Sequence, residues 1–175
     1  MRYLGATKHV KLRLSSAGEL ELRCYVDADW AGDRVDRKST TGFVFQLGSS
    51  VVAWTSRKQS TVALSSTEAE YMAASCACRE LLWLRVLLED LGIPANGPTM
   101  IFKDNQACIK MADSNWSGAR TKHIDVCYHH LRDLREQNVI TLQYCPSNNM
   151  LADILTKPLC KEKFLRLSLL LGLEG

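Results

Sequence analysis

Four acidic residues lie at positions from which their carboxylates could together support phosphodiester hydrolysis. Asp27 lies at the end of the first expected strand, and Asp104 directly follows a later one. If those two strands are parallel neighbours, both carboxylates lie at the same edge of the sheet. Glu70 and Asp153 lie in the first turns of two expected helices. Four carboxylates in one cleft would need a divalent cation, and Mg²⁺ prefers such oxygen ligands. Two ions about 4 Å apart activate a water and stabilise the leaving oxygen in phosphodiester hydrolysis.

Each of these acids also has a purely structural interpretation. Asp104 could cap the helix that follows it. Glu70 could complete a T-x-x-E capping box with Thr67, a role for which Glu68 and Ser65 compete. The two remaining acids could simply be solvated. Spacing alone therefore leaves the metal site open.

Length and composition set the limits for the whole chain. Its 175 residues suit one domain, and 46% hydrophobic with 23% charged residues exclude a wholly disordered chain. No apolar run reaches the ~18 residues of a membrane span, so no membrane partner is expected. A net charge of +3 permits nucleic-acid binding without arguing for it. The seven cysteines, an odd number, are expected to be reduced core thiols.

The order of the expected elements predicts the fold class. Alternating segments indicate strands and three-to-four spacing indicates helices. Three strands, the last two joined by a tight hairpin, should form an antiparallel meander before a long helix and two further crossover units. We therefore expect an α/β protein whose five-stranded mixed sheet has three antiparallel and then two parallel strands, with helices on its faces. The expected strands are residues 20–28, 42–47, 51–55, 99–103 and 139–145, and the expected helices are 67–91, 104–111, 122–137, one after Pro146, and 161–171.

Five segments of the chain carry a resemblance to a known family. They are YVDADWAGDRVDRKSTTGFVF, AWTSRKQSTVALSSTEAEYMA, KDNQACIKMA, RTKHIDVCYHHLRD and ADILTKPL. In this order and spacing they resemble the ribonuclease H domain of copia-type retrotransposon polyproteins, from about residue 20 to the end. Residues 1–17 look like the tail of a preceding reverse transcriptase, which would make 18–175 the ribonuclease H domain.

The resemblance implies a fold, a cofactor and a site. It implies a ribonuclease H-like fold with helices on both faces of the sheet, and two Mg²⁺ ions, with Mn²⁺ as a substitute. The metal-binding and catalytic residues would be Asp27, Glu70, Asp104 and Asp153. Glu70 is preferred to Glu68 because AEYMAA matches the family's helix and because its register points Glu70 inward.

The implied activity is hydrolysis of the RNA strand of an RNA–DNA hybrid during reverse transcription. The implied partners are that hybrid and the reverse transcriptase domain, in the cytoplasm within a virus-like particle, or in the nucleus. Short polar side chains can read the minor groove of a hybrid. Members of this family often carry a histidine in the loop before the last acid, but residues 144–149 of this chain contain none, and the nearest candidate, His123, lies at the start of the helix expected at 122–137. The candidate substrate-binding residues are Ser66, Thr67, Asn105, Gln106 and His123.

Two other functions remain open. One is a non-catalytic connection or binding domain of the same fold, or a domesticated relic, although the presence of all four acids argues against it. The other is a nuclease or integrase acting on duplex DNA, and such enzymes typically lack the glutamate found here at position 70. The low net charge and the lack of a basic substrate-gripping segment predict weak activity for the isolated domain.

Overall fold

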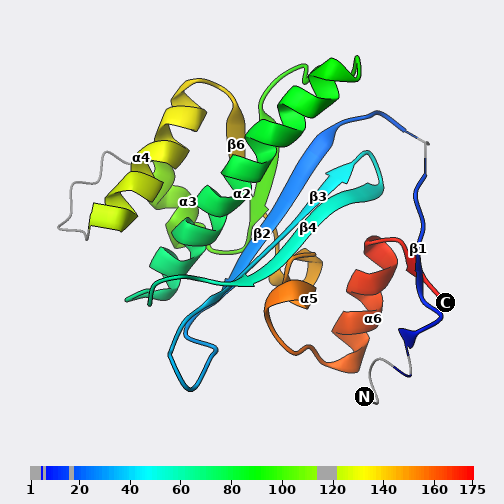
Figure 1. The fold of residues 1–175 in the computed structure, drawn as a ribbon, viewed down its shortest axis with the longest axis horizontal. Coiled ribbons are helices and arrows are strands. Elements are labelled where there is room, and N and C mark those ends of the chain that lie inside the picture. The colour runs from blue at the N-terminus through cyan, green and yellow to red at the C-terminus, as the bar shows by residue number, and fades with distance from the viewer. Residues whose placement is uncertain (1–4, 6, 16–17, 114–121) are drawn as a thin grey trace.

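A five-stranded mixed sheet forms the centre of the molecule (Figure 1). The computed structural model describes residues 5, 7–15, 18–113 and 122–175, and the side chains of 113 and 122–125 are outside this description. The strand order is β4-β3-β2-β5-β6, with β2, β3 and β4 antiparallel and β5 parallel to both neighbours. This is the predicted topology. The strands are β2 (Leu22–Asp29), β3 (Thr40–Leu47), β4 (Ser50–Lys58), β5 (Thr99–Lys103) and β6 (Ile140–Tyr144).

Helices cover both faces of this sheet, as predicted (Figure 1). The long helix α2 packs on β2 and β3 and contacts α4, while α5 packs on the opposite face together with α6. The single helix expected after Pro146 is instead a 3₁₀ turn followed by the one-turn helix α5. The helical segments are α2 (Ser66–Asp90), α3 (Gln106–Asp113), α4 (Lys122–Glu136), the 3₁₀ turn (Ser147–Asn149), α5 (Asp153–Thr156) and α6 (Lys161–Leu170).

The alternation of side chains along β2 separates the core from the site. Cys24 and Val26 point into the larger core beneath α2. Because successive strand residues face opposite sides, Tyr25 and Asp27 point toward the α5 face, where Tyr25 stacks on Phe102 with ring centroids 4.8 Å apart. This alternation places a buried carboxylate beneath the last short helix.

The segment before residue 18 contacts the end of the chain. β1 (Lys11–Leu12) pairs antiparallel with β7 (Leu173–Glu174), and Arg13 N donates to Gly172 O at 2.8 Å. The hydroxyl of Ser50 accepts from Ser15 N at 2.7 Å and donates to Ser15 O at 2.9 Å. No pattern in the sequence predicts this two-stranded ribbon, and the boundary at residue 18 stays a prediction.

Two further expectations concern membrane-spanning helices and the state of the cysteines. No helix in the described part of the chain is both long and apolar enough to cross a membrane. All seven cysteines are free. The expectation of core thiols is correct for Cys24, Cys78, Cys108 and Cys145, but it is wrong for Cys160, which is exposed.

Candidate metal centre

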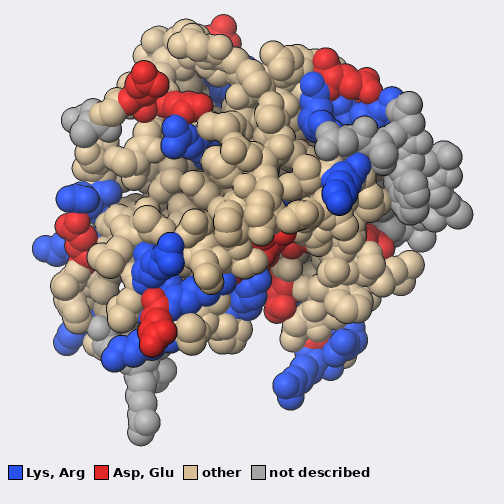
Figure 2. All heavy atoms as spheres, turned by 180° about the vertical axis from the view of Figure 1, so that it is seen from behind, with Lys and Arg blue, Asp and Glu red and all other residues tan. Residues whose placement is uncertain are grey.

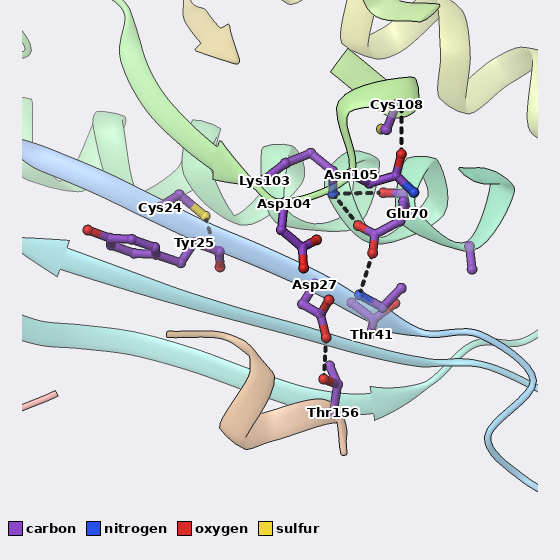
Figure 3. A network of polar contacts seen from close by, with 12 residues as sticks. Cys24, Tyr25, Asp27, Thr41, Glu70, Lys103, Asp104, Asn105, Cys108 and Thr156 are labelled. Atoms are coloured by element: carbon purple, nitrogen blue, oxygen red, sulfur yellow. Dashed lines mark hydrogen bonds and ion pairs between the residues drawn. The ribbon is translucent and has the colours of Figure 1, made fainter. Parts of the chain in front are cut away.

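Three of the four predicted acids meet at one edge of the sheet. One carboxylate oxygen from each of Asp27, Asp104 and Asp153 lies within 4.8 Å of the other two. Asp27 lies near the end of β2, Asp104 directly follows β5, and Asp153 opens α5. Because β2 and β5 are parallel neighbours, their ends bring the first two carboxylates together, and Figure 3 shows Asp104 and Asp27 side by side.

Glu70 lies next to this cluster, but its carboxylate is engaged elsewhere. Its Oε1 accepts a hydrogen bond from Ala28 N at 3.3 Å, and its Oε2 accepts one from Lys103 Nζ at 2.6 Å (Figure 3). Glu70 is therefore not among the three acids whose oxygens converge. The inward register predicted for Glu70 is correct, since the side chain is buried.

The capping role proposed as an alternative for Glu70 belongs to Glu68. Ser65 Oγ accepts from Glu68 N at 3.1 Å, and Glu68 Oε2 accepts from Leu64 N at 2.9 Å. These bonds satisfy backbone donors that the start of α2 would otherwise leave unpaired. The start of the helix is stabilised without Glu70.

Two lysines offset the charge of the aspartate cluster. Lys157 Nζ lies 3.3 Å from Asp27 Oδ2 and 2.9 Å from Asp153 Oδ1. Lys163 Nζ pairs with the other oxygen of Asp153. Figure 2 shows acidic side chains in a hollow of the molecular surface, with basic side chains on both sides. Without a divalent ion, lysines stabilise the closely spaced carboxylates.

Hydroxyl groups orient two of the aspartates. The Thr156 hydroxyl, from the last residue of α5, donates to Asp27 Oδ2. Ser147 Oγ, from the 3₁₀ turn, donates to Asp104 Oδ2 at 2.9 Å. Groups that hydrogen-bond metal-ligating carboxylates in this way fix their orientation.

Burial raises the pKa of two of the acids. The pKa of Asp153 is raised chiefly because burial disfavours its charge; Lys163 and Lys157 oppose the rise and Asp27 adds to it. Burial also raises the pKa of Glu70, with Lys103 opposing the rise and Asp27 and Asp104 adding to it. Both acids therefore hold a proton more readily than ordinary carboxyl groups do.

The donor set fits a hard divalent cation. Three carboxylates from three different elements converge on one point, and a cation bound there would relieve their mutual repulsion. Mg²⁺ favours such oxygen ligands and keeps part of its water shell. The residues that would hold it are Asp27, Asp104 and Asp153, and Glu70 beside them is paired with Lys103.

The predicted substrate-binding residues lie at the starts of two helices. Asn105 Oδ1 accepts from Cys108 N at 2.9 Å, so Asn105 caps α3 and the alternative in which Asp104 is the cap is wrong. Gln106 is exposed in the first turn of α3. Ser66 and Thr67 begin α2, the first exposed and the second partly buried. His123 falls on α4, but its side chain lies outside the described residues.

Four residues of this site are not among those predicted from the sequence, namely Thr156, Lys157, Lys163 and Lys103. Thr156 and Lys157 follow Asp153 by three and four residues, a spacing at which helical side chains meet, so this signal was available. Lys163 approaches from another helix. Lys103 gave no signal, because it ends an apolar strand where a solvated lysine is ordinary.

Comparison with known proteins supplies relatives across nearly the whole chain. The chain is 37% identical over 164 residues to the Retrovirus-related Pol polyprotein from transposon RE1 of Arabidopsis thaliana, covering 94% of this chain and 11% of that protein. It is 36% identical over 175 residues to that from transposon TNT 1-94 of Nicotiana tabacum, covering 100% of this chain and 13% of that protein. The chain thus spans about an eighth or less of these curated relatives. No family model matches the chain.

Solved structures show which fold this is. The N-terminal ribonuclease H domain of a Mycobacterium tuberculosis protein matches with a TM-score of 0.57 at 14% identity, covering 86% of this chain and 98% of that one. LC11-RNase H1 in complex with an RNA/DNA hybrid matches with a TM-score of 0.56 at 13% identity, covering 78% and 94%. The foamy viral protease-reverse transcriptase in complex with such a hybrid matches with a TM-score of 0.57 at 16% identity, covering 85% and 22%. The fold is the ribonuclease H fold.

Proposed function

We propose that this chain, a homologue of a segment of copia-type retrotransposon Pol polyproteins, is a metal-dependent endonuclease that hydrolyses the RNA strand of RNA–DNA hybrids. The observation that carries the proposal is the convergence of Asp27, Asp104 and Asp153 within 4.8 Å on a ribonuclease H fold. Two structural neighbours bound to RNA/DNA hybrids support this substrate class.

The chain's own residues would build the reaction centre. Asp27, Asp104 and Asp153 would hold the divalent ions, and Glu70 would complete the set for a second ion. Two such ions, when bound, supply an activated water and stabilise the leaving oxygen in phosphodiester hydrolysis. Thr156 keeps one oxygen of Asp27 oriented while the ions bind. No side chain needs to form a covalent bond with the substrate.

Recognition of the hybrid would come from the surface around this centre. Ser66, Thr67, Asn105 and Gln106 could contact 2′-hydroxyl groups in the wide minor groove. The basic side chains on both sides of the acidic hollow (Figure 2) could hold phosphates. We also propose that His123 contacts a phosphate.

The relatives suggest where such an activity would operate. Because they are Pol polyproteins, we propose that the chain removes template RNA after first-strand synthesis, beside a reverse transcriptase of which residues 1–17 would be the tail. This would occur in the cytoplasm within a virus-like particle, or in the nucleus. The low net charge suggests that the adjoining reverse transcriptase domain provides part of the surface that binds the hybrid.

The test is cleavage of a hybrid whose RNA strand is labelled, with Mg²⁺, Ca²⁺ or EDTA. We expect cleavage with Mg²⁺ and none with EDTA, and a loss of at least ~100-fold in rate for Asp104→Asn. Asp90→Asn makes the same change of charge at the exposed end of α2 and should cleave at the normal rate. Labelled duplex DNA should stay intact.

Three results would overturn the proposal. Hybrid cleavage that persists in EDTA or in Asp104→Asn would remove the metal centre. A wild-type chain that binds the hybrid but never cuts it would be a non-catalytic domain of the same fold. Preferential cutting of duplex DNA would identify a different class of nuclease.

A further inference from the structure

Lys103 is a charged side chain with no access to solvent. It is the last residue of β5 and is 0% exposed. Its Nζ donates to Glu70 Oε2 at 2.6 Å and to the backbone oxygen of Glu70 at 3.2 Å (Figure 3). A buried charge without a partner is very costly, so this pair must be formed whenever both groups are charged and dry.

The thiols around Lys103 cannot take the place of Glu70. Three buried thiols interact with its charge, and burial raises their pKa, to about 12 for Cys78 and about 11 for Cys108. Thiols of this kind stay neutral and offer no anion. Lys103 Nζ lies 2.6 Å from Glu70 Oε2 and 3.2 Å from the backbone oxygen of Glu70, so Glu70 is the residue that compensates its charge.

Both oxygens of Glu70 are engaged when no metal is bound. Oε1 holds Ala28 N and Oε2 holds Lys103, while the three aspartates converge without Glu70. An ammonium at 2.6 Å and a divalent ion on the same carboxylate would repel each other strongly in a site of low dielectric constant. Lys157 and Lys163, which pair with Asp153, are partly exposed and can turn into water when an ion binds, whereas the Lys103 side chain is 0% exposed. Any ion that uses Glu70 must first displace a lysine that cannot reach water from where it lies.

We propose that Lys103 is a built-in cation that occupies the Glu70 side of the carboxylate cluster, so that the substrate-free chain binds one divalent ion at the three aspartates and a second far more weakly. The proposal rests on the proposed function, because it assumes that the aspartates bind metal. Lys103 is then a positioning residue. It holds Glu70 in place and sets the number of ions that the free chain carries.

The test counts metal ions without measuring catalysis. Mn²⁺ is titrated into the full chain, and the free ion is followed by electron paramagnetic resonance. Wild type should bind one Mn²⁺ per chain, with a second at least ~10-fold weaker. Lys103→Met keeps the bulk of the side chain without its charge, and it should bind the second ion with affinity close to that of the first. Lys110→Met, at an exposed position on α3, should behave as wild type.

A second variant keeps the test decisive if Lys103→Met does not fold. Glu70→Gln should leave the affinity for the first ion unchanged, whereas Asp153→Asn should abolish it. The inference is overturned if wild type binds two ions equally, if folded Lys103→Met still binds one, or if Glu70→Gln weakens the first ion as much as Asp153→Asn does. If instead the proposed function is wrong and the aspartates do not bind metal, Asp153→Asn would leave Mn²⁺ binding unchanged.

Discussion

A side chain at Gly42 would collide with Thr156. A Cβ atom at Gly42 would lie 2.5 Å from Thr156 Cγ2 and 3.1 Å from both Ala152 O and Leu155 Cβ. Gly42 also lies directly opposite Asp27 in the β2–β3 pair. The missing side chain therefore lets α5 approach the sheet closely enough for the Thr156 hydroxyl to reach Asp27.

Gly42→Ala should damage the metal centre from outside it. Because the new methyl group meets backbone as well as side-chain atoms, α5 must shift and carry Asp153 and Thr156 away from Asp27. We expect a loss of about 1–3 kcal/mol in the free energy of unfolding, as for other overpacked sites. Urea denaturation measures this loss, and Mn²⁺ titration should show weaker metal binding.

Gly97→Ala is the matched control for this substitution. No atom lies within 4 Å of a Cβ at this exposed position. Its stability and metal affinity should match wild type. If Gly42→Ala behaved the same way, close approach at Gly42 would not be what positions α5.

Thr156→Val should weaken metal binding while preserving the packing. Valine keeps the shape of the side chain but cannot donate a hydrogen bond to Asp27 Oδ2, so Asp27 loses its orientation. Loss of such a bond typically lowers metal affinity about 10–100-fold. Isothermal titration with Ca²⁺ measures the affinity without turnover.

Thr156→Ser separates the two roles of this side chain. Serine retains the hydroxyl and loses the methyl group beside Gly42, so Ca²⁺ affinity should stay close to that of wild type. Equal affinities for wild type, Thr156→Val and Thr156→Ser would show that the hydrogen bond does not orient Asp27 for metal binding.

Strong periodicity made most of the fold predictable. β5 has the predicted bounds of residues 99–103. The three-to-four spacing of apolar residues predicts α2 with each end displaced by one residue. β4 continues to Lys58, three residues beyond its predicted end, because its polar end carries no alternation. The β1–β7 ribbon could not be predicted, because two residues paired over such a long sequence separation leave no local pattern.

The candidate site was predictable to a different extent for each acid. Asp27 and Asp104 follow from strand order, because parallel neighbours end at one edge. Asp153 joins them at the start of α5, where a helix is predicted, although its length of a single turn is not. The ion pair of Glu70 could not be foreseen, because no sequence rule distinguishes a buried lysine such as Lys103 from a solvated one at the end of a strand.

Metal binding should weaken as the pH falls. This loss should occur at a higher pH than for a site whose aspartates have ordinary pKa values. Burial raises the pKa of Asp153 above the value of about 3.9 for an exposed aspartate. Protonation removes a ligand, so the rise in melting temperature caused by Ca²⁺ should grow as the pH increases through this raised pKa. Thermal melts with and without Ca²⁺, from about pH 4 to pH 8, measure it.

The metal-free chain should show the opposite trend in the same pH range. A folded-state pKa above the unfolded value means that the folded chain binds more protons there, so the metal-free chain loses stability as the pH rises. Asp153→Asn should remove part of this slope. Metal-free stability that rises with pH throughout the range would contradict the raised pKa.

Arg85 should contribute to stability without affecting the metal centre. Its Nη1 donates to Gly97 O at 3.0 Å and to Thr99 Oγ1 and Val139 O at 3.1 Å each, which ties α2 to the segments that open β5 and β6. Arg85→Met keeps the aliphatic stem but leaves these acceptors without their charged donor. We expect a loss of about 1–3 kcal/mol in the free energy of unfolding, measured by urea denaturation with an unchanged m-value.

Arg79→Met supplies the comparison on the same helix. Arg79 is exposed, so its replacement should change the free energy of unfolding by less than about 0.5 kcal/mol. Both variants should bind Mn²⁺ as wild type does, because Arg85 acts where β5 begins and the aspartates meet beyond its end. A stability loss in Arg85→Met no larger than in Arg79→Met would mean that water replaces the arginine at all three acceptors, and that packing alone holds α2 against the starts of β5 and β6.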